Sequence, residues 1–197
     1  MMDKQEKLYA LYDAAIRIFA KYGYKKTTVE DIAAELGMTK GNIYLYAENK
    51  QDLYNQSLAY ALKKWQGYAV SAMEEENDVI SKIITYTNKG YEYLCVNTNL
   101  RTIIINDPSV FPLSSGEDKF HHINLESMEI LSGLIREGIA KGVFRDIDVQ
   151  AAAELLYSVY VMFIIKTYVK SELTQPDTLM TASLDLLMHG LIKKKNK

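Results

Sequence analysis

The chain has 197 residues and a formal net charge of −2, with 48% hydrophobic and 24% charged residues, so its composition is that of a globular protein and argues against disorder. Its single cysteine, Cys95, excludes a disulfide framework and a cysteine-rich zinc site, and favours a reducing compartment. We see no signal-peptide pattern, and no continuous apolar run approaches the roughly 20 residues of a membrane-spanning helix. We therefore expect a cytoplasmic protein with no membrane partner.

The charge is unevenly distributed along the chain. Residues 1–66 carry ten Lys or Arg and eight Asp or Glu, whereas the remainder carries thirteen and seventeen. The N-terminal third is thus the more basic part, which permits an interaction with nucleic acid without requiring one.

The first residues predict two helices separated by a glycine break. Apolar residues recur on one helical face through residues 8–22, and Gly23 follows as a C-cap. Thr27 or Thr28 can cap a second helix, for which Thr27 and Glu30 have the spacing of a capping box.

A third, short helix follows directly. The second helix ends at Gly37, and Thr39 can cap a helix that runs to about Tyr46. This order is that of a helix-turn-helix unit, whose last helix enters the major groove of DNA. Asn49 can cap a fourth helix, which extends to about Met73.

The rest of the sequence predicts more helices and no strands. Three prolines and long patterns of 3.6-residue period favour an all-α fold with about nine helices. Loops are predicted at residues 107–118 and 142–148. The later helices are predicted at residues 78–97, 99–106, 118–141, 148–170 and 176–193.

The segment MTKGNIYLYAENK, residues 38–50, carries the groups that a DNA-reading helix needs. Lysine, asparagine and tyrosine side chains can donate to phosphates and base edges, and a glycine permits close approach. The end of a helix that exposes N–H groups also attracts phosphate. We predict DNA contacts from Thr27, Thr28, Thr39, Lys40, Gly41, Asn42, Tyr44, Tyr46 and Lys50.

Residues 8–58 resemble the DNA-binding region of the TetR-type transcriptional repressors. The matching text is AAIRIFAKYGYKKTTVEDIAAELGMTKGNIYLYAENKQDLYNQSL. It follows the family order of an apolar helix, T-T-x-x-x-I-A-x-x-x-G, a small hydroxyl residue, Lys, Gly and a Y-x-Y-F-x-x-K tail. Two positions depart from it: Ala47 stands where the family usually has Phe, and Leu45 where it often has His or Arg.

The resemblance implies a DNA-binding domain at residues 1–48 and a helical ligand-binding and dimerisation domain at residues 49–197. Members usually repress transcription as homodimers on palindromic operators and leave DNA when a small molecule binds. Activation rather than repression is left open by the residues.

An extensive apolar surface predicts the dimer contact. LLYSVYVMFII, residues 155–165, is hydrophobic on nearly every face, so one face is expected against the chain's own core and another against a partner. With the helix at residues 177–192 it predicts an isologous two-fold dimer resembling a four-helix bundle. The predicted interface residues are Leu156, Tyr160, Phe163, Leu184, Leu187 and Leu191.

Aromatic residues suggest the class of effector. Fifteen tyrosines are many for this length, and a group of them in the C-terminal region suits an apolar pocket with a few polar groups, although helix packing explains each one singly. We predict an apolar or aromatic effector. The predicted ligand contacts are Tyr86, Tyr93, Phe111, His122, Tyr157 and Tyr160.

Other function classes have less support. The sequence contains no set of nucleophile, base and orienting group, so we expect no enzyme, and we expect no metal and no cofactor. Two alternatives remain: an all-α enzyme that uses the tyrosine-rich region, and a dimeric small-molecule-binding module whose DNA-binding head is weakened or inactive, with Ala47 as the symptom.

Overall fold

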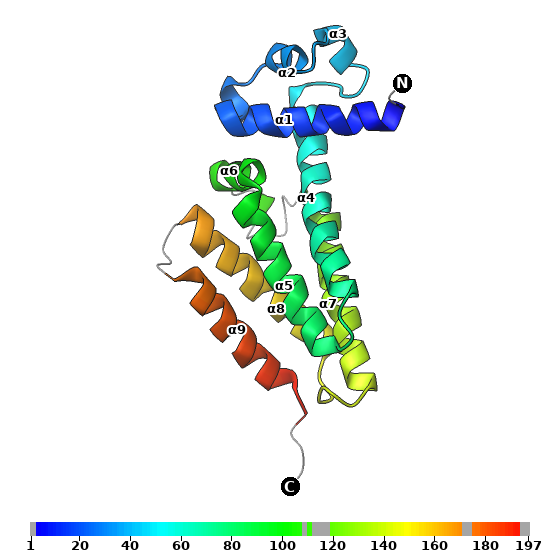
Figure 1. The fold of residues 1–197 in the computed structure, drawn as a ribbon, viewed down its shortest axis with the longest axis vertical. Coiled ribbons are helices and arrows are strands. Elements are labelled where there is room, and N and C mark those ends of the chain that lie inside the picture. Colours follow the sequence, from blue (N-terminus) through cyan, green and yellow to red (C-terminus); the bar gives the residue numbers. More distant parts are fainter. Residues whose placement is uncertain (1–2, 108–109, 112–118, 171–174, 194–197) are drawn as a thin grey trace. The chain divides into compact units, whose positions relative to one another are not determined.

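The computed structural model describes residues 3–107, 110–111, 119–170 and 175–193, and over these residues the fold is all-α, as predicted. The one pairing of extended backbone in these ranges is an isolated antiparallel bridge between Phe144 and Ile192. The helices are α1 (Lys4–Lys26), α2 (Val29–Glu35), α3 (Lys40–Ile43), α4 (Lys50–Glu74), α5 (Val79–Val96), α6 (Thr98–Asn106), α7 (His121–Ala140), α8 (Val149–Ile164), the π-helix η2 (Ile165–Val169) and α9 (Pro176–Leu191) (Figure 1).

The predicted helices are present close to their predicted bounds, with small local differences. The third ends at Ile43, and a turn rather than a helix leads to Tyr46. The capping box of α2 joins Thr28 to Asp31, not Thr27 to Glu30. Most of the predicted loop at 107–118 lies outside the described residues.

The chain divides into two compact units. The N-terminal unit comprises Met1–Trp65 and Leu94–Phe120, and the C-terminal unit comprises Gln66–Tyr93 and His121–Lys197. Helices α4 and α5 each contribute residues to both units. The functional boundary predicted between residues 48 and 49 lies within the N-terminal unit and stays a prediction.

Aromatic packing organises the core of the N-terminal unit. The ring of Tyr54 on α4 lies 5.0 Å from the rings of both Phe19 and Tyr24, and its hydroxyl donates a 2.8 Å hydrogen bond to Asp107. Burial, and then the bond to the Asp107 carboxylate, raise the pKa of Tyr54 far above its ordinary value. This residue therefore joins α4 both to α1 and to the segment after α6.

The end of α1 is tied to α4 by Lys50. Gly23 breaks the regular helix with a φ of 78°, a conformation that favours glycine, as the sequence predicted. The Nζ of Lys50 donates to the carbonyl oxygens of Tyr24 at 2.9 Å and Thr27 at 3.0 Å, and lies 4.5 Å from the centre of the Tyr24 ring. Carbonyls at the end of a helix lack partners within it, so the ammonium supplies the missing donors.

The C-terminal unit has an apolar core built from the end of α4 and from α5, α7, α8 and α9 (Figure 1). Its lower end is closed by the segment after α7. The N–H of Arg145 donates to the Leu191 carbonyl at 2.9 Å, and the N–H of Lys193 donates to the Val143 carbonyl at 2.9 Å. Between them Phe144, 2% exposed, packs directly on Gly138 of α7.

Replacing Gly138 by alanine is expected to destabilise the protein. A Cβ at this position would lie 2.0 Å from the buried Phe144 ring, so that ring or the backbone would have to shift. Overpacking of this kind lowers the free energy of unfolding by about 1–3 kcal/mol. Denaturation in urea would measure the loss. Gly133→Ala is the control, because its Cβ on the same helix meets nothing within 4 Å and it is expected to be neutral or stabilising. Equal effects of the two changes would contradict this packing.

Lys50→Ala is expected to lower the melting temperature of the protein. Two partly buried carbonyl groups lose their donor, and each group left without a hydrogen bond costs about 1–3 kcal/mol of folding free energy. Lys40→Ala serves as the control, because Lys40 is exposed and forms a surface ion pair. A melting temperature that is unchanged by Lys50→Ala would show that the ammonium is not a structural tie.

Candidate nucleic-acid interface

The short helix α3 is held by one buried side chain and one cap. Ile43 is fully buried, and the Oγ1 of Thr39 accepts from the N–H of Asn42 at 3.3 Å. The remaining side chains of the segment consequently face solvent. We call the exposed residues of this region the reading surface: Thr28, Thr39, Lys40, Gly41, Asn42, Tyr44 and Leu45.

The reading surface offers both hydrogen-bond donors and apolar area. Lys40 begins α3, and its Nζ lies 5.8 Å from the centre of the Tyr44 ring, which is 43% exposed. Leu45 is 79% exposed beside it. Donors at the start of a recognition helix contact base edges and phosphates, and apolar side chains contact thymine methyl groups. Six of the nine predicted DNA contacts thus lie together on one exposed surface.

Three predicted contacts are placed differently. Thr27 is 1% exposed, and its Oγ1 donates to the Gly23 carbonyl at 2.9 Å, so its hydroxyl cannot reach DNA in this arrangement. The ammonium of Lys50 is held by two backbone carbonyls as described above, because the end of α1 requires donors. Tyr46 is half-buried.

Sequence reasoning missed Glu30 as a member of this region. Its carboxylate accepts from the ammonium of Lys40 at 2.7 Å, and both side chains are about half exposed. The hydrogen bond to Lys40 is the main cause that lowers the pKa of Glu30, and the same bond raises the pKa of Lys40. The position of Glu30 on the exposed face of α2 was a signal that it lies near the DNA-binding residues. The sequence does not tell which lysine pairs with it.

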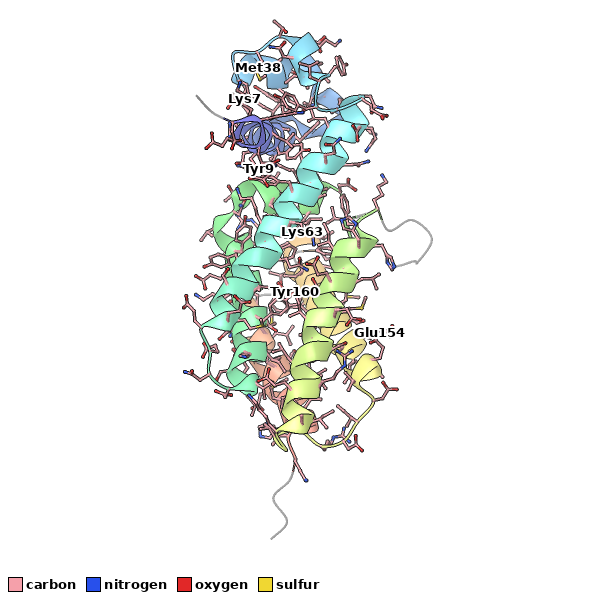
Figure 2. All side chains as sticks on the ribbon, turned by 90° about the vertical axis from the view of Figure 1, so that its right-hand side faces the viewer. Lys7, Tyr9, Met38, Lys63, Glu154 and Tyr160 are labelled. Atoms are coloured by element: carbon pink, nitrogen blue, oxygen red, sulfur yellow. The ribbon has the colours of Figure 1, made fainter. Side chains whose placement is uncertain are left out.

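The predicted effector contacts are only partly brought together. Tyr86, Tyr93, Tyr157 and Tyr160 lie in the C-terminal unit and are all at least partly buried. Figure 2 shows Tyr160 among the side chains inside this unit, whereas Glu154 on the same helix points outward.

The other two predicted effector contacts lie elsewhere. Phe111 belongs to the N-terminal unit, where its ring lies 6.1 Å from that of Trp65. His122 is exposed at the start of α7. Phe111 therefore belongs to a different unit from the four tyrosines, and His122 is in their unit but exposed.

Aromatic pairs occupy the C-terminal unit around α5. The rings of Tyr68 and Tyr93 lie 5.3 Å apart, and Tyr91 lies 5.3 Å from Phe163 and 5.9 Å from Tyr168. Burial raises the pKa of Tyr86, and a hydrogen bond to Ser127 acts in the opposite direction. This region combines ring surface with phenol groups.

The predicted dimer residues are mostly inside the chain's own core. Leu156, Phe163, Leu184 and Leu191 are each 5–7% exposed, and Tyr160 and Leu187 are half-buried. The exposed apolar residues of α8 and α9 are instead their neighbours on the opposite side of each helix. We call these the outer face: Leu155, Met162, Leu179 and Leu186. An all-apolar helix gives no signal for which of its sides faces inward, and the dimer contact of the six residues stays a prediction.

Comparisons with known proteins agree with this geometry. Residues 11–56 match the model for bacterial regulatory proteins of the tetR family. Over 98% of this chain and 100% of the relative, the sequence is 26% identical to the fatty acid metabolism regulator protein of Bacillus subtilis.

Two solved structures share the fold. One is the transcriptional regulator FadR from Bacillus subtilis in complex with stearoyl-CoA, with a TM-score of 0.75 and 23% identity over 91% of this chain and 97% of that one. The other is a transcriptional regulator from Saccharomonospora viridis in complex with choline, with a TM-score of 0.78 and 19% identity over 97% of this chain and 100% of that one. The helix-turn-helix geometry and the family match together identify the N-terminal region as the DNA-binding region of a TetR-type transcriptional regulator, and the two solved structures share the all-α fold of the chain.

Proposed function

We propose that this regulator is a cytoplasmic repressor that binds a palindromic operator as a two-fold homodimer and leaves it when a long-chain fatty acyl-CoA binds the C-terminal unit. The observation that carries the effector class is the similarity, over nearly the whole chain, to a fatty acid metabolism regulator. The reading surface supports operator binding, and Ala47, 5% exposed, is buried in the same unit.

The outer face supports the homodimer. Leu186 is 73% exposed and Leu155 is 55% exposed. Exposure of several apolar side chains along two helices is unfavourable in water and marks an interaction surface. Residues Val149–Val169 are long and apolar enough to cross a membrane by composition, yet only 28% of the 18-residue window is buried. A second copy that covers this face accounts for both facts and presents two reading surfaces to successive turns of DNA, about 34 Å apart or a multiple of that spacing.

The interior of the C-terminal unit supports an elongated apolar effector. Its core is formed mainly by aliphatic side chains, and the partly buried tyrosines add phenol groups that can hydrogen-bond a carbonyl oxygen. An acyl thioester combines a long apolar chain with one such carbonyl. The structure of a similar regulator with stearoyl-CoA supports this chemical class.

A quaternary ammonium compound is the competing class of effector. A structural relative was determined with choline, and clustered tyrosine rings attract such cations through their faces. The acyl thioester is preferred, because the relative similar along the whole sequence is named for fatty acid metabolism.

The proposed release works by a shift between two states of the dimer. The effector changes the balance only by its difference in affinity for the two states, and DNA must then weaken effector binding by the same factor. Helix α4 carries residues of both units, so it is a continuous covalent path between the effector region and the reading surface.

Leu186→Arg is expected to convert the dimer into a monomer at micromolar concentration, because a charge would be buried without a partner at the centre of the interface. Sedimentation velocity gives the mass. Thr181→Arg places the same charge at another exposed position of α9, outside the outer face, and should leave the dimer intact. A dimer that persists in Leu186→Arg would mean that another surface joins the protomers.

Palmitoyl-CoA is expected to raise the melting temperature and to release the protein from operator DNA, whereas coenzyme A alone and choline should do neither. Ligand at 100 times its Kd stabilises the native state by about 2.7 kcal/mol, which is readily measured by thermal unfolding. Release by choline, with no effect of the acyl thioester, would instead establish the quaternary ammonium class.

A further inference from the structure

One residue of the reading surface, Lys40, is paired with an exposed acidic residue, Glu30. Glu30 lies in the first turn of α2, with its carboxylate 2.7 Å from the ammonium of Lys40 at the start of α3. DNA presents a dense row of phosphates, so a carboxylate here opposes binding to every sequence alike. It also neutralises the lysine at the first position of the recognition helix. Such a residue weakens affinity unless it contacts something that is not a phosphate.

Stability does not account for the pair. The side chains of Lys40 and Glu30 are 49% and 57% exposed, and ion pairs in this setting contribute little to folding. The short helices are held instead by Ile43 and by the caps at Thr28 and Thr39. The ion pair is therefore available for a role in recognition.

The ammonium and carboxylate form a donor and an acceptor side by side on an exposed surface. In the major groove a G·C pair shows the complementary set: guanine has acceptors at N7 and O6, and cytosine has the N4 amino donor. Guanine O6 and cytosine N4 are hydrogen-bonded to each other and so lie about 2.9 Å apart, close to the spacing of the two protein groups. One ion pair can thus satisfy both bases of a single pair.

We propose that Lys40 and Glu30 together read one G·C base pair in each operator half-site, with Lys40 donating to guanine and Glu30 accepting from the cytosine amino group. This inference rests on the operator binding proposed above. Glu30 then sets specificity. Its repulsion of phosphates weakens binding to all duplexes, and its hydrogen bond to a cytosine amino group offsets this loss only where such a group lies opposite.

An A·T pair fits less well. Its adenine amino group could donate to Glu30, but the adenine N7 acceptor lies directly beside that group and repels a carboxylate. Thymine offers Lys40 one acceptor next to a methyl group, where guanine offers two adjacent acceptors. The ion pair therefore favours G·C over A·T at the position it contacts.

The test begins by selecting operator duplexes from a random palindromic library with the full-length wild-type protein. At each G·C pair of the half-site, cytosine is replaced by an analogue that lacks the 4-amino group. Affinities are measured for the wild type, Glu30→Ala and Glu30→Gln. Glu35→Ala is the matched control, because Glu35 is another exposed acid of α2, paired with Arg17 at 3.3 Å.

At one position, loss of the amino group should weaken wild-type binding by about 10-fold, within the range of a good base contact. In Glu30→Ala the same replacement should change affinity by less than about 2-fold, while binding to unrelated duplexes becomes tighter. Glu30→Gln, which keeps an acceptor oxygen, should retain part of the preference, and Glu35→Ala should retain all of it.

Two results would overturn the inference. If Glu30→Ala changes affinity for every duplex by one common factor, the acid acts only through repulsion or structure. If no cytosine amino group matters more to the wild type than to Glu30→Ala, the ion pair reads no base. Failure of the wild type to select any duplex would overturn operator binding itself, which is a distinguishable outcome.

Discussion

A recognition helix of four residues, Lys40–Ile43, is far too short to be stable in isolation, since helix nucleation alone is unfavourable. Its conformation depends on burial of Ile43 and on the cap that Thr39 provides, and Lys50 ties the next helix, α4, to the end of α1. These contacts turn the remaining side chains of the segment toward solvent. The donors that face DNA are thus positioned by residues that do not face it.

The same tie belongs to a wider set of contacts between α1 and α4. Tyr12 donates to the amide oxygen of Gln56, the rings of Tyr9 and Tyr60 stack 4.8 Å apart, and Lys64 pairs with Asp13 at 3.1 Å. Together with the Lys50 hydrogen bonds, these contacts join α1 to α4 at both the N-terminal and the C-terminal half of α1 (Figure 2 labels Tyr9). A displacement of α4 would therefore be carried to the reading surface, which is what the proposed population shift requires.

Periodicity and capping residues were sufficient to predict the helices, the break at Gly23 and the exposed position of most reading residues. They were insufficient where a side chain had two physically sensible partners. Lys50 could meet a phosphate or the carbonyls that end α1, and only the fold brings those carbonyls within reach. Leu156 and Leu155 are adjacent on an apolar helix, and only packing decides that the first is buried and the second exposed. The ion-pair partner of Glu30 is a lysine ten residues away in sequence, and only the fold brings the two side chains together.

Specific DNA binding by a pair of protomers can be measured by fluorescence anisotropy with DNA flanking the protein's own gene, at two salt concentrations. We expect specific binding of two chains per palindrome that weakens steeply as salt rises, because binding releases cations from the phosphates. Absence of specific binding at low salt, with the effector-free protein, would contradict it.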